Sequence, residues 1–169
     1  VENPSAHPLG TPSGKIEIRC DALAATEASA IPRCRVAAPD PGYPLRMITP
    51  HSKFRVNSQN ANLPWARRLV EQALAMNPRD AAPRGIRNGD TVRVRSPEGE
   101  MRIGVSLTED IVVGCVALPQ GAWTVHDAQG VEIGGAANTL TSTTPTLPSQ
   151  GSRTHSVFVE VTRATGGAR

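Results

Sequence analysis

This sequence has few aromatic residues, few cysteines and no long apolar run. Aromatic residues make up only 3% of its 169 positions, so aliphatic side chains must fill the core. Its three cysteines, Cys20, Cys34 and Cys115, form no Cys-x-x-Cys pair, which argues against a metal cluster or a disulfide framework. No run approaches the roughly 20 apolar residues of a membrane helix, so we expect no direct membrane insertion.

Recognisable catalytic motifs are also missing. There is no Gly-x-Ser-x-Gly elbow and no His-x-x-x-His spacing, and the four histidines are dispersed. The 18 basic residues, 16 Arg and 2 Lys, are scattered among acidic residues, which argues against nucleic acid as the main partner. Arg binds phosphates and carboxylates through paired hydrogen bonds, so a smaller anionic ligand fits better. We therefore expect no catalytic residues in this chain.

The residues that are present predict a mainly β fold. Fifteen Pro and fifteen Gly indicate many turns. Alternating or continuous apolar patterns predict strands, and they span residues 15–20, 45–48, 91–96, 101–107, 111–118 and 156–161. About six of these strands would close into a small β-barrel, because closure removes exposed edges. Short helices are predicted at 22–30, from Asn62 as N-cap through 64–72, and after Asn77.

The domain organisation follows from these patterns. Residues 1–44, rich in Pro, form an extended connector with one strand at 15–20. Residues 45–162 form the barrel domain, and 163–169 form a disordered tail. Val1 is not an initiator Met, so we expect the chain to be a piece of a longer protein.

Two polar loops are the candidate binding regions. The loop after residue 48 carries many hydrogen-bonding side chains, and Phe54 and Trp65 would pin its ends to the body. A second loop begins at Gly134-Gly135, where backbone amides can approach a ligand closely. The alternative for the first is a long solvated surface loop.

Several separated motifs together resemble one family, the C-terminal domain of the molybdopterin-dependent oxidoreductases of the dimethyl sulfoxide reductase type. Their order and spacing are preserved from about Thr11 to Val161. The motifs are Thr11-Pro-Ser-Gly-Lys-Ile-Glu17, Ile48-Thr-Pro-His51 followed by Arg55 and Ser58-Gln59, Pro64-Trp65, Asn77-Pro78-x-Asp80-Ala81, Arg84-Gly-Ile-x-Asn-Gly-Asp-Thr-Val-Arg-Val94, Gly121-Ala-Trp123, Gly134-Gly135 and Asn138-Thr-Leu-Thr141.

The resemblance implies a double-psi β-barrel that covers one side of a molybdopterin guanine dinucleotide. It also implies a short strand at 73–76, where propensity alone would continue the helix, because the residues before Asn-Pro are extended in the family. By this analogy, phosphate or pterin contacts come from Thr49, His51, Arg55, Ser58 and Gln59. Asn77 and Asp80 would recognise the guanine, whose N1–H and amino group are donors that suit a carboxylate. Asn138 would reach the pterin, and Gln150 or His155 would complete that surface. The sequence departs from the family at Asn57, where many members have His, and at Pro83 inside the short helix.

Other interpretations of the same residues remain. Asn77 and Asp80 also fit a helix cap, and His51 also fits a structural histidine. A stand-alone barrel enzyme of the pyruvoyl decarboxylase type, cleaved at Gly151-Ser152, and a protein interaction module are the alternative functions. The family implies as partners the N-terminal domains of the parent oxidoreductase and an iron–sulfur electron-transfer subunit. Its members occur in the bacterial periplasm or cytoplasm, and this sequence does not choose between them.

Overall fold

The computed structural model describes residues 3, 5–25, 29–31, 33, 38–146 and 149–164. The chain forms two compact units. The N-terminal unit comprises Val1–Val36 and Pro145–Gly151, and the barrel unit comprises Ala37–Thr144 and Ser152–Arg169. The barrel unit therefore begins earlier than the predicted residue 45, and it excludes a short segment that we had placed inside it.

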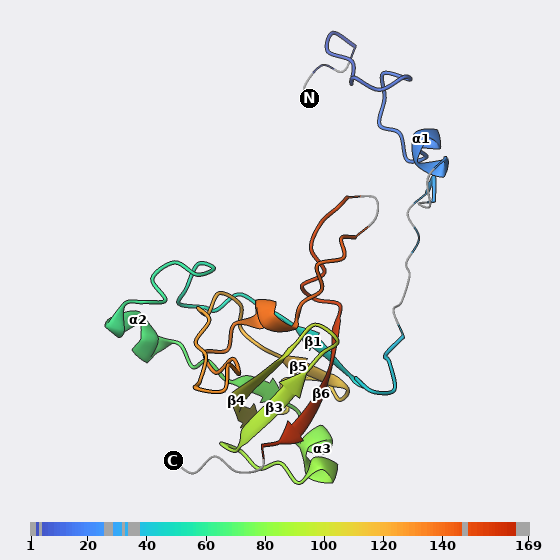
Figure 1. The fold of residues 1–169 in the computed structure, drawn as a ribbon. Helices are drawn as coiled ribbons and strands as arrows, with labels where there is room; N and C mark the ends of the chain where they lie inside the picture. The colour runs from blue at the N-terminus through green and yellow to red at the C-terminus, as the bar shows by residue number, and fades with distance from the viewer. Residues whose placement is uncertain are drawn as a thin grey trace. The chain divides into compact units, whose positions relative to one another are not determined.

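Six strands form the closed barrel of the second unit (Figure 1). In chain order they are β1 (Leu45–Ile48), β2 (Leu74–Met76), β3 (Thr91–Arg95), β4 (Glu100–Leu107), β5 (Cys115–Ala117) and β6 (Val157–Arg163). Around the barrel the order is β1-β5-β2-β4-β3-β6. β1 pairs with β5 and β2 with β4 in parallel, and the other four pairs are antiparallel. The predicted double-psi β-barrel is confirmed.

Alternation of apolar and polar residues explains why these segments form strands. In β3, Val92 and Val94 are fully buried while the residues on either side are exposed. β4 and β6 repeat the pattern with Met101 and Val159 among their inward residues. Since successive side chains of a strand point to opposite faces, one face of each strand lines a common core. That core is aliphatic, as the shortage of aromatic residues predicts.

The helices are short. They are α1 (Asp21–Ala24), α2 (Pro64–Leu69) and α3 (Pro78–Ala81), with 3-10 turns η1 (Ala82–Arg84) and η2 (Ala137–Leu140). Asn77 caps α3 as predicted, because its side-chain oxygen accepts a hydrogen bond from the Arg79 amide at 2.9 Å. Within the part of the chain that the structure describes, no helix is long and apolar enough to cross a membrane.

The predicted strand at residues 15–20 is wrong. This segment forms turns and irregular backbone, and Ile16 and Ile18 are 83% and 79% exposed. Its alternation is that of a strand, but no described segment pairs with it, and an unpaired strand has neither a ladder nor a buried face. The helix predicted at 22–30 shortens to α1, and residues 26–28 lie outside the described part of the chain.

Three further boundaries differ from prediction. β5 begins at Cys115 and not at residue 111, because a turn with Gly114 at φ +84° precedes it and leaves Val112 70% exposed. α2 ends at Leu69 and not near residue 72, and its N-cap is Leu63 in place of Asn62. Arg163 still belongs to β6, and residues 165–169 of the predicted tail lie outside the described residues.

Strand directions divide the connecting segments between two ends of the barrel. β1 and β5 both finish at the end where β2 and β6 start, which we call the loop end. Thr49, Gln72 and His155 therefore lie at the loop end. β2 finishes at the opposite end, next to the start of β5, and leads into α3 there. We call this the helix end, and it carries Asn77 and Asp80.

Candidate functional site

Arg55 lies at the centre of the polar network at the loop end. Its Nη2 donates to the Gln72 side-chain oxygen at 2.9 Å and to the Gln120 carbonyl oxygen at 2.6 Å. Its Nε is buried without a hydrogen-bond partner. Burial lowers the pKa of Arg55, because desolvation disfavours the charged form, yet a guanidinium remains protonated at physiological pH. No carboxylate pairs with it among the described residues.

Gln72 connects Arg55 to two other loops. Its Nε2 donates to the Pro119 carbonyl at 2.8 Å and to the Gly135 carbonyl at 2.9 Å. The polar loop, the segment after β5 and the Gly134-Gly135 loop therefore meet at one side chain. The predicted convergence of the two polar loops occurs at this end of the barrel.

Gln120 and Gly121 hold the polar loop from its other side. The Gln120 Nε2 lies 2.9 Å from the Asn57 side-chain oxygen and 3.1 Å from each ring nitrogen of His51. Gly121 has φ +89°, and a Cβ built there would lie 1.9 Å from the Asn57 carbonyl oxygen. Only glycine permits this close approach, so the Gly121-Ala-Trp123 motif has a steric basis.

Thr49 and His155 join the end of β1 to the start of β6. The buried Thr49 hydroxyl donates to the Thr154 carbonyl at 3.0 Å, and the Thr49 amide donates to His155 Nδ1 at 3.2 Å. Thr49 is thus engaged within the protein. The accepting Nδ1 of His155 leaves the ring proton on Nε2, and this ring is exposed.

The remaining predicted residues of this group differ in placement. Ser58, Gln59 and Asn138 are exposed at the surface of the barrel unit. The Ser58 carbonyl accepts a hydrogen bond from the Trp123 indole at 3.0 Å. Gln150 belongs to the N-terminal unit.

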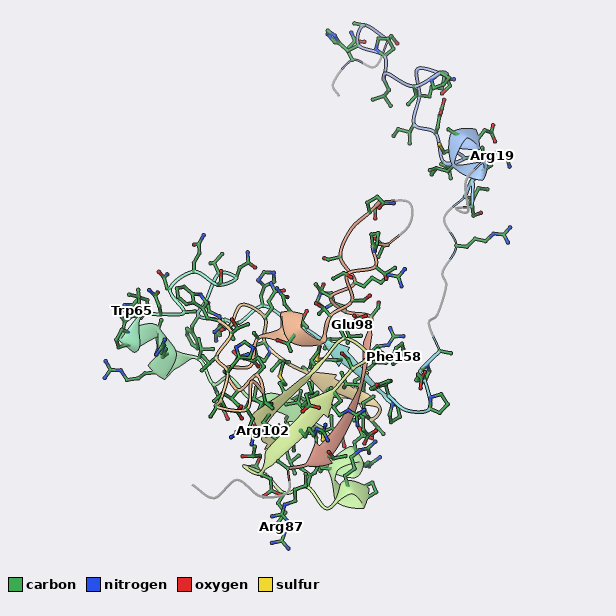
Figure 2. All side chains as sticks on the ribbon, in the orientation of Figure 1. Arg19, Trp65, Arg87, Glu98, Arg102 and Phe158 are labelled. Atoms are coloured by element: carbon green, nitrogen blue, oxygen red, sulfur yellow. The ribbon has the colours of Figure 1, made fainter. Side chains whose placement is uncertain are left out.

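Phe54 and Trp65 do not pin the polar loop as predicted. Each side chain is 52% exposed, and Trp65 lies on α2, away from the strands (Figure 2). Arg55, Gln72, Gln120 and Gly121 hold the loop in their place. Hydrogen bonds and one steric contact, and not aromatic packing, therefore fix its conformation.

A cavity of about 260 Å³ opens beside Arg55. It lies between α2 and the segment after β5, and Arg55 and Arg67 supply its two cationic side chains. The other lining residues are Ala61, Ala66, Val70, Gln72, Ala122, Trp123, Val125 and Gly134. Two guanidinium groups and an indole beside apolar walls suit an anionic ligand with a flat ring.

The backbone amides of the Gly134-Gly135 loop already bind an anion of the protein itself. The Glu132 side chain, 1% exposed, accepts hydrogen bonds from the amides of Gly134 at 2.7 Å, Gly135 at 3.0 Å and Val125 at 3.3 Å. These donors are therefore not free for a ligand, contrary to our interpretation of this loop. Its contribution is the Gly135 carbonyl that holds Gln72.

Asn77 and Asp80 lie together at the helix end, away from this network. The Asn77 amide nitrogen donates to the Ile111 carbonyl at 2.6 Å while its oxygen caps α3, so both ends of this side chain are engaged. One oxygen of Asp80 accepts from the Gly114 amide at 2.8 Å. The other carboxylate oxygen has no partner among the described residues, and no cation pairs with the group.

The loop-end residues fit the pterin dinucleotide that the resemblance implies. Arg55 is a cation without a counter-charge, and its Nη1 is neither hydrogen-bonded nor buried among the described residues. Phosphates are suitable acceptors for such a donor. No group of three or more His, Cys, Asp or Glu side chains that could hold a metal ion occurs in the described ranges.

Sequence reasoning missed Gln72, Gln120 and Glu132. Gln72 was assigned to the end of a helix, and Gln120 precedes the Gly-Ala-Trp motif without belonging to it. Glu132 sits two residues before the glycine pair, which is the one signal that an internal anion fills this loop.

Comparison with known proteins agrees with this geometry. The family described as "Molydopterin dinucleotide binding domain" matches residues 45–158. The chain is 39% identical to dimethyl sulfoxide reductase DmsA of Escherichia coli (strain K12), over 95% of this chain and 22% of that protein. It is 38% identical to a trimethylamine-N-oxide reductase of Haemophilus influenzae, over 72% of this chain and 16% of that protein.

A solved structure shows the same fold. Acetylene hydratase from Pelobacter acetylenicus superposes with a TM-score of 0.78 at 15% identity, covering 95% of this chain and 25% of that one. The chain spans about a fifth of the length of the curated reductases that it matches.

Proposed function

This chain belongs to the family of molybdopterin dinucleotide-binding domains of the dimethyl sulfoxide reductase type, and from that premise we propose which of its residues hold the cofactor. The cofactor is molybdopterin guanine dinucleotide with molybdenum. The loop end binds its pterin and phosphate groups, and Asp80 at the helix end binds the guanine. When bound, the cofactor supplies metal-centred redox chemistry, while the residues of this chain bind and orient it.

The uncompensated charge of Arg55 carries the proposal. A guanidinium that is partly buried, held by two neutral acceptors and paired with no carboxylate is poised for an external anion. His51, Ser58, Gln59, Asn138 and His155 are exposed polar residues of the barrel unit, and we propose them as further ligands of the cofactor. We place Gln150 in this set from the family resemblance alone.

Two predicted ligands act indirectly in this proposal. Thr49 fixes the 154–155 segment, because its hydroxyl and amide are both bonded there. Asn77 fixes the turn before β5 by its bond to the Ile111 carbonyl, and it thereby sets the position of Gly114 beside Asp80. Asp80 keeps one free carboxylate oxygen for the guanine donors.

The larger protein around this chain is part of the same proposal. The matched dimethyl sulfoxide reductases are between four and five times as long as the matched region. We propose that the chain is the cofactor-covering domain of a molybdenum-dependent oxidoreductase, that the preceding domains complete the binding site, and that an iron–sulfur subunit delivers electrons.

The Arg55→Ala substitution tests the proposal. Loss of a hydrogen bond to a charged group costs on the order of 1.5–3 kcal/mol, so retention of the cofactor should weaken roughly 10- to 150-fold. The full-length protein is dialysed extensively and then denatured by acid hydrolysis. The measurement is the amount of GMP released per polypeptide. Arg93→Ala is the control, because Arg93 is exposed on β3 and pairs with Glu100. Equal GMP release from both variants would remove Arg55 from the site.

A further inference from the structure

Gln72 holds Arg55 by a hydrogen bond to an uncharged side-chain amide. The Gln72 oxygen accepts from Arg55 Nη2 at 2.9 Å, and its nitrogen is turned away from Arg55 by donating to the Pro119 and Gly135 carbonyls. These two carbonyls fix which end of the amide faces Arg55, since they can only accept hydrogen bonds. The amide orientation is therefore set by the barrel and not by Arg55.

The second holder of Arg55 is also neutral. Nη2 donates to the Gln120 carbonyl as well, so both of its hydrogens are used. Nη1 then forms no hydrogen bond with the described residues, and it is not buried. Fixing one terminal nitrogen of a planar guanidinium also fixes the plane and direction of the other.

We propose that Gln72 is a positioning residue for the cofactor site. It holds the Arg55 guanidinium so that Nη1 is presented to an anionic group, and, being uncharged, it leaves the positive charge of Arg55 available to that group. A carboxylate at position 72 would reach Arg55 equally well but would neutralise it. This inference rests on the proposed function of Arg55.

The glycine loop supports Gln72 in turn. The Gly135 carbonyl that receives Gln72 belongs to the loop folded around the buried Glu132 carboxylate. A Cβ built on Gly135 would lie 2.7 Å from the Gln72 side chain, so the loop and Gln72 are in close contact. The Glu132 carboxylate is thus hydrogen-bonded by backbone amides, and it forms no ion pair with Arg55.

Two substitutions at position 72 separate positioning from stability. Gln72→Met removes the hydrogen bonds with little change of shape, and Gln72→Glu keeps an acceptor for Arg55 but adds a negative charge. Both lose the donor to Pro119 and Gly135, so their free energies of unfolding should fall by similar amounts. Gln129→Glu is the charge-matched control, because Gln129 is an exposed turn residue.

The readout is the GMP retained by the intact protein after dialysis. We expect Gln72→Met to retain about tenfold less than the unchanged protein, the effect of one hydrogen bond to a charged group. Gln72→Glu should retain as little as Arg55→Ala, and Gln129→Glu should be unchanged. In the Arg55→Ala background, Gln72→Met should have no further effect, because it acts through Arg55.

Four results would overturn the inference. In the first, the losses of GMP caused by Arg55→Ala and Gln72→Met add up in the double variant. In the second, GMP retention by Gln72→Met and Gln72→Glu falls in proportion to their free energies of unfolding. Either result would mean that Gln72 only stabilises the fold. Full retention in both Gln72 variants, with Arg55→Ala defective, would overturn the inference and leave the proposed function standing. Full retention in Arg55→Ala would overturn both.

Discussion

At the scale of single residues, buried polar groups in this barrel bind main-chain partners. Glu132, Asn77 and Asp80 are each less than 9% exposed, and each accepts from backbone amides. Such bonds satisfy a buried group without a second buried side chain that must itself be satisfied. Asp80 is the exception in one respect, because it retains an unused oxygen.

The Asp80→Asn substitution tests the guanine contact. The amide oxygen of Asn can still accept from the Gly114 amide, so stability should change little. The charge and one acceptor are lost, while the guanine N1–H and amino group are both donors. We therefore expect about tenfold weaker retention of the dinucleotide by the dialysed protein, measured as the GMP that acid hydrolysis releases. Wild-type retention would assign Asp80 to structure alone.

At the scale of elements, the segment after β5 organises the loop end. It supplies the Pro119 and Gln120 carbonyls, the Gln120 side chain and the close contact at Gly121. β5 itself is only Cys115–Ala117, so most of this segment is irregular backbone on a short strand. Its conformation depends on the contacts that it makes with the polar loop.

A pair of glycine substitutions tests this dependence. Gly121→Ala places a methyl group on the Asn57 carbonyl in a left-handed conformation, and it should destabilise the protein by about 3 kcal/mol. Gly130→Ala has the same kind of strain at φ +78° but meets no atom within 4 Å, so it should cost about 1 kcal/mol. Urea unfolding of both variants measures the difference, and equal costs would exclude the steric contact.

Local sequence patterns predicted most helices and strands, because the structure of these elements depends mainly on residues close together in the sequence. The β3–β4 hairpin and the Asn77 cap depend on alternation and on a side chain next to its own helix. The prediction of a strand at 15–20 is wrong because a strand needs a second strand to pair with. The alternation of residues 15–20 does not show whether such a strand exists. The strand predicted to begin at residue 111 begins at Cys115 instead. Apolar residues such as Val112 can also lie in an exposed turn before a strand, so an apolar run alone does not fix where the strand starts.

The candidate site was predictable in its residue types but not in its partners. Arg55 and His155 are proposed ligands that the family resemblance supplies, while Gln72 owes its contacts to bonds across 47 and 63 positions. No local pattern encodes such distant contacts. The sequence suggests that the amides of Gly134 and Gly135 bind a ligand, because it does not show that both amides donate to the Glu132 side chain.

At the scale of the whole barrel, β6 closes the structure. It pairs with β1 through residues 157–159 and with β3 through residues 160–163, so it is the one strand between them. Its inward residues Val157, Val159 and Val161 are at most 6% exposed. Removing it would open two edges and expose the core from one side.

A chain shortened after Ser156 should therefore lose cooperative unfolding. The loss of three buried valines and of both β6 ladders is comparable to the roughly 5–15 kcal/mol that stabilises a typical domain. Circular dichroism during heating measures the transition of the full and shortened chains. A sharp transition in the shortened chain would show that the other strands form a stable sheet without closure.

Because Thr49 receives its partners from residues 154 and 155, the loop end depends on parts of the polypeptide made far apart in time. Those partners lie 105 and 106 positions later. At roughly 5–20 residues per second of synthesis, they leave the ribosome roughly 5–20 seconds after Thr49. A nascent chain therefore exposes an incomplete loop end throughout that interval, and loading of the nucleotide has to wait until translation has passed β6.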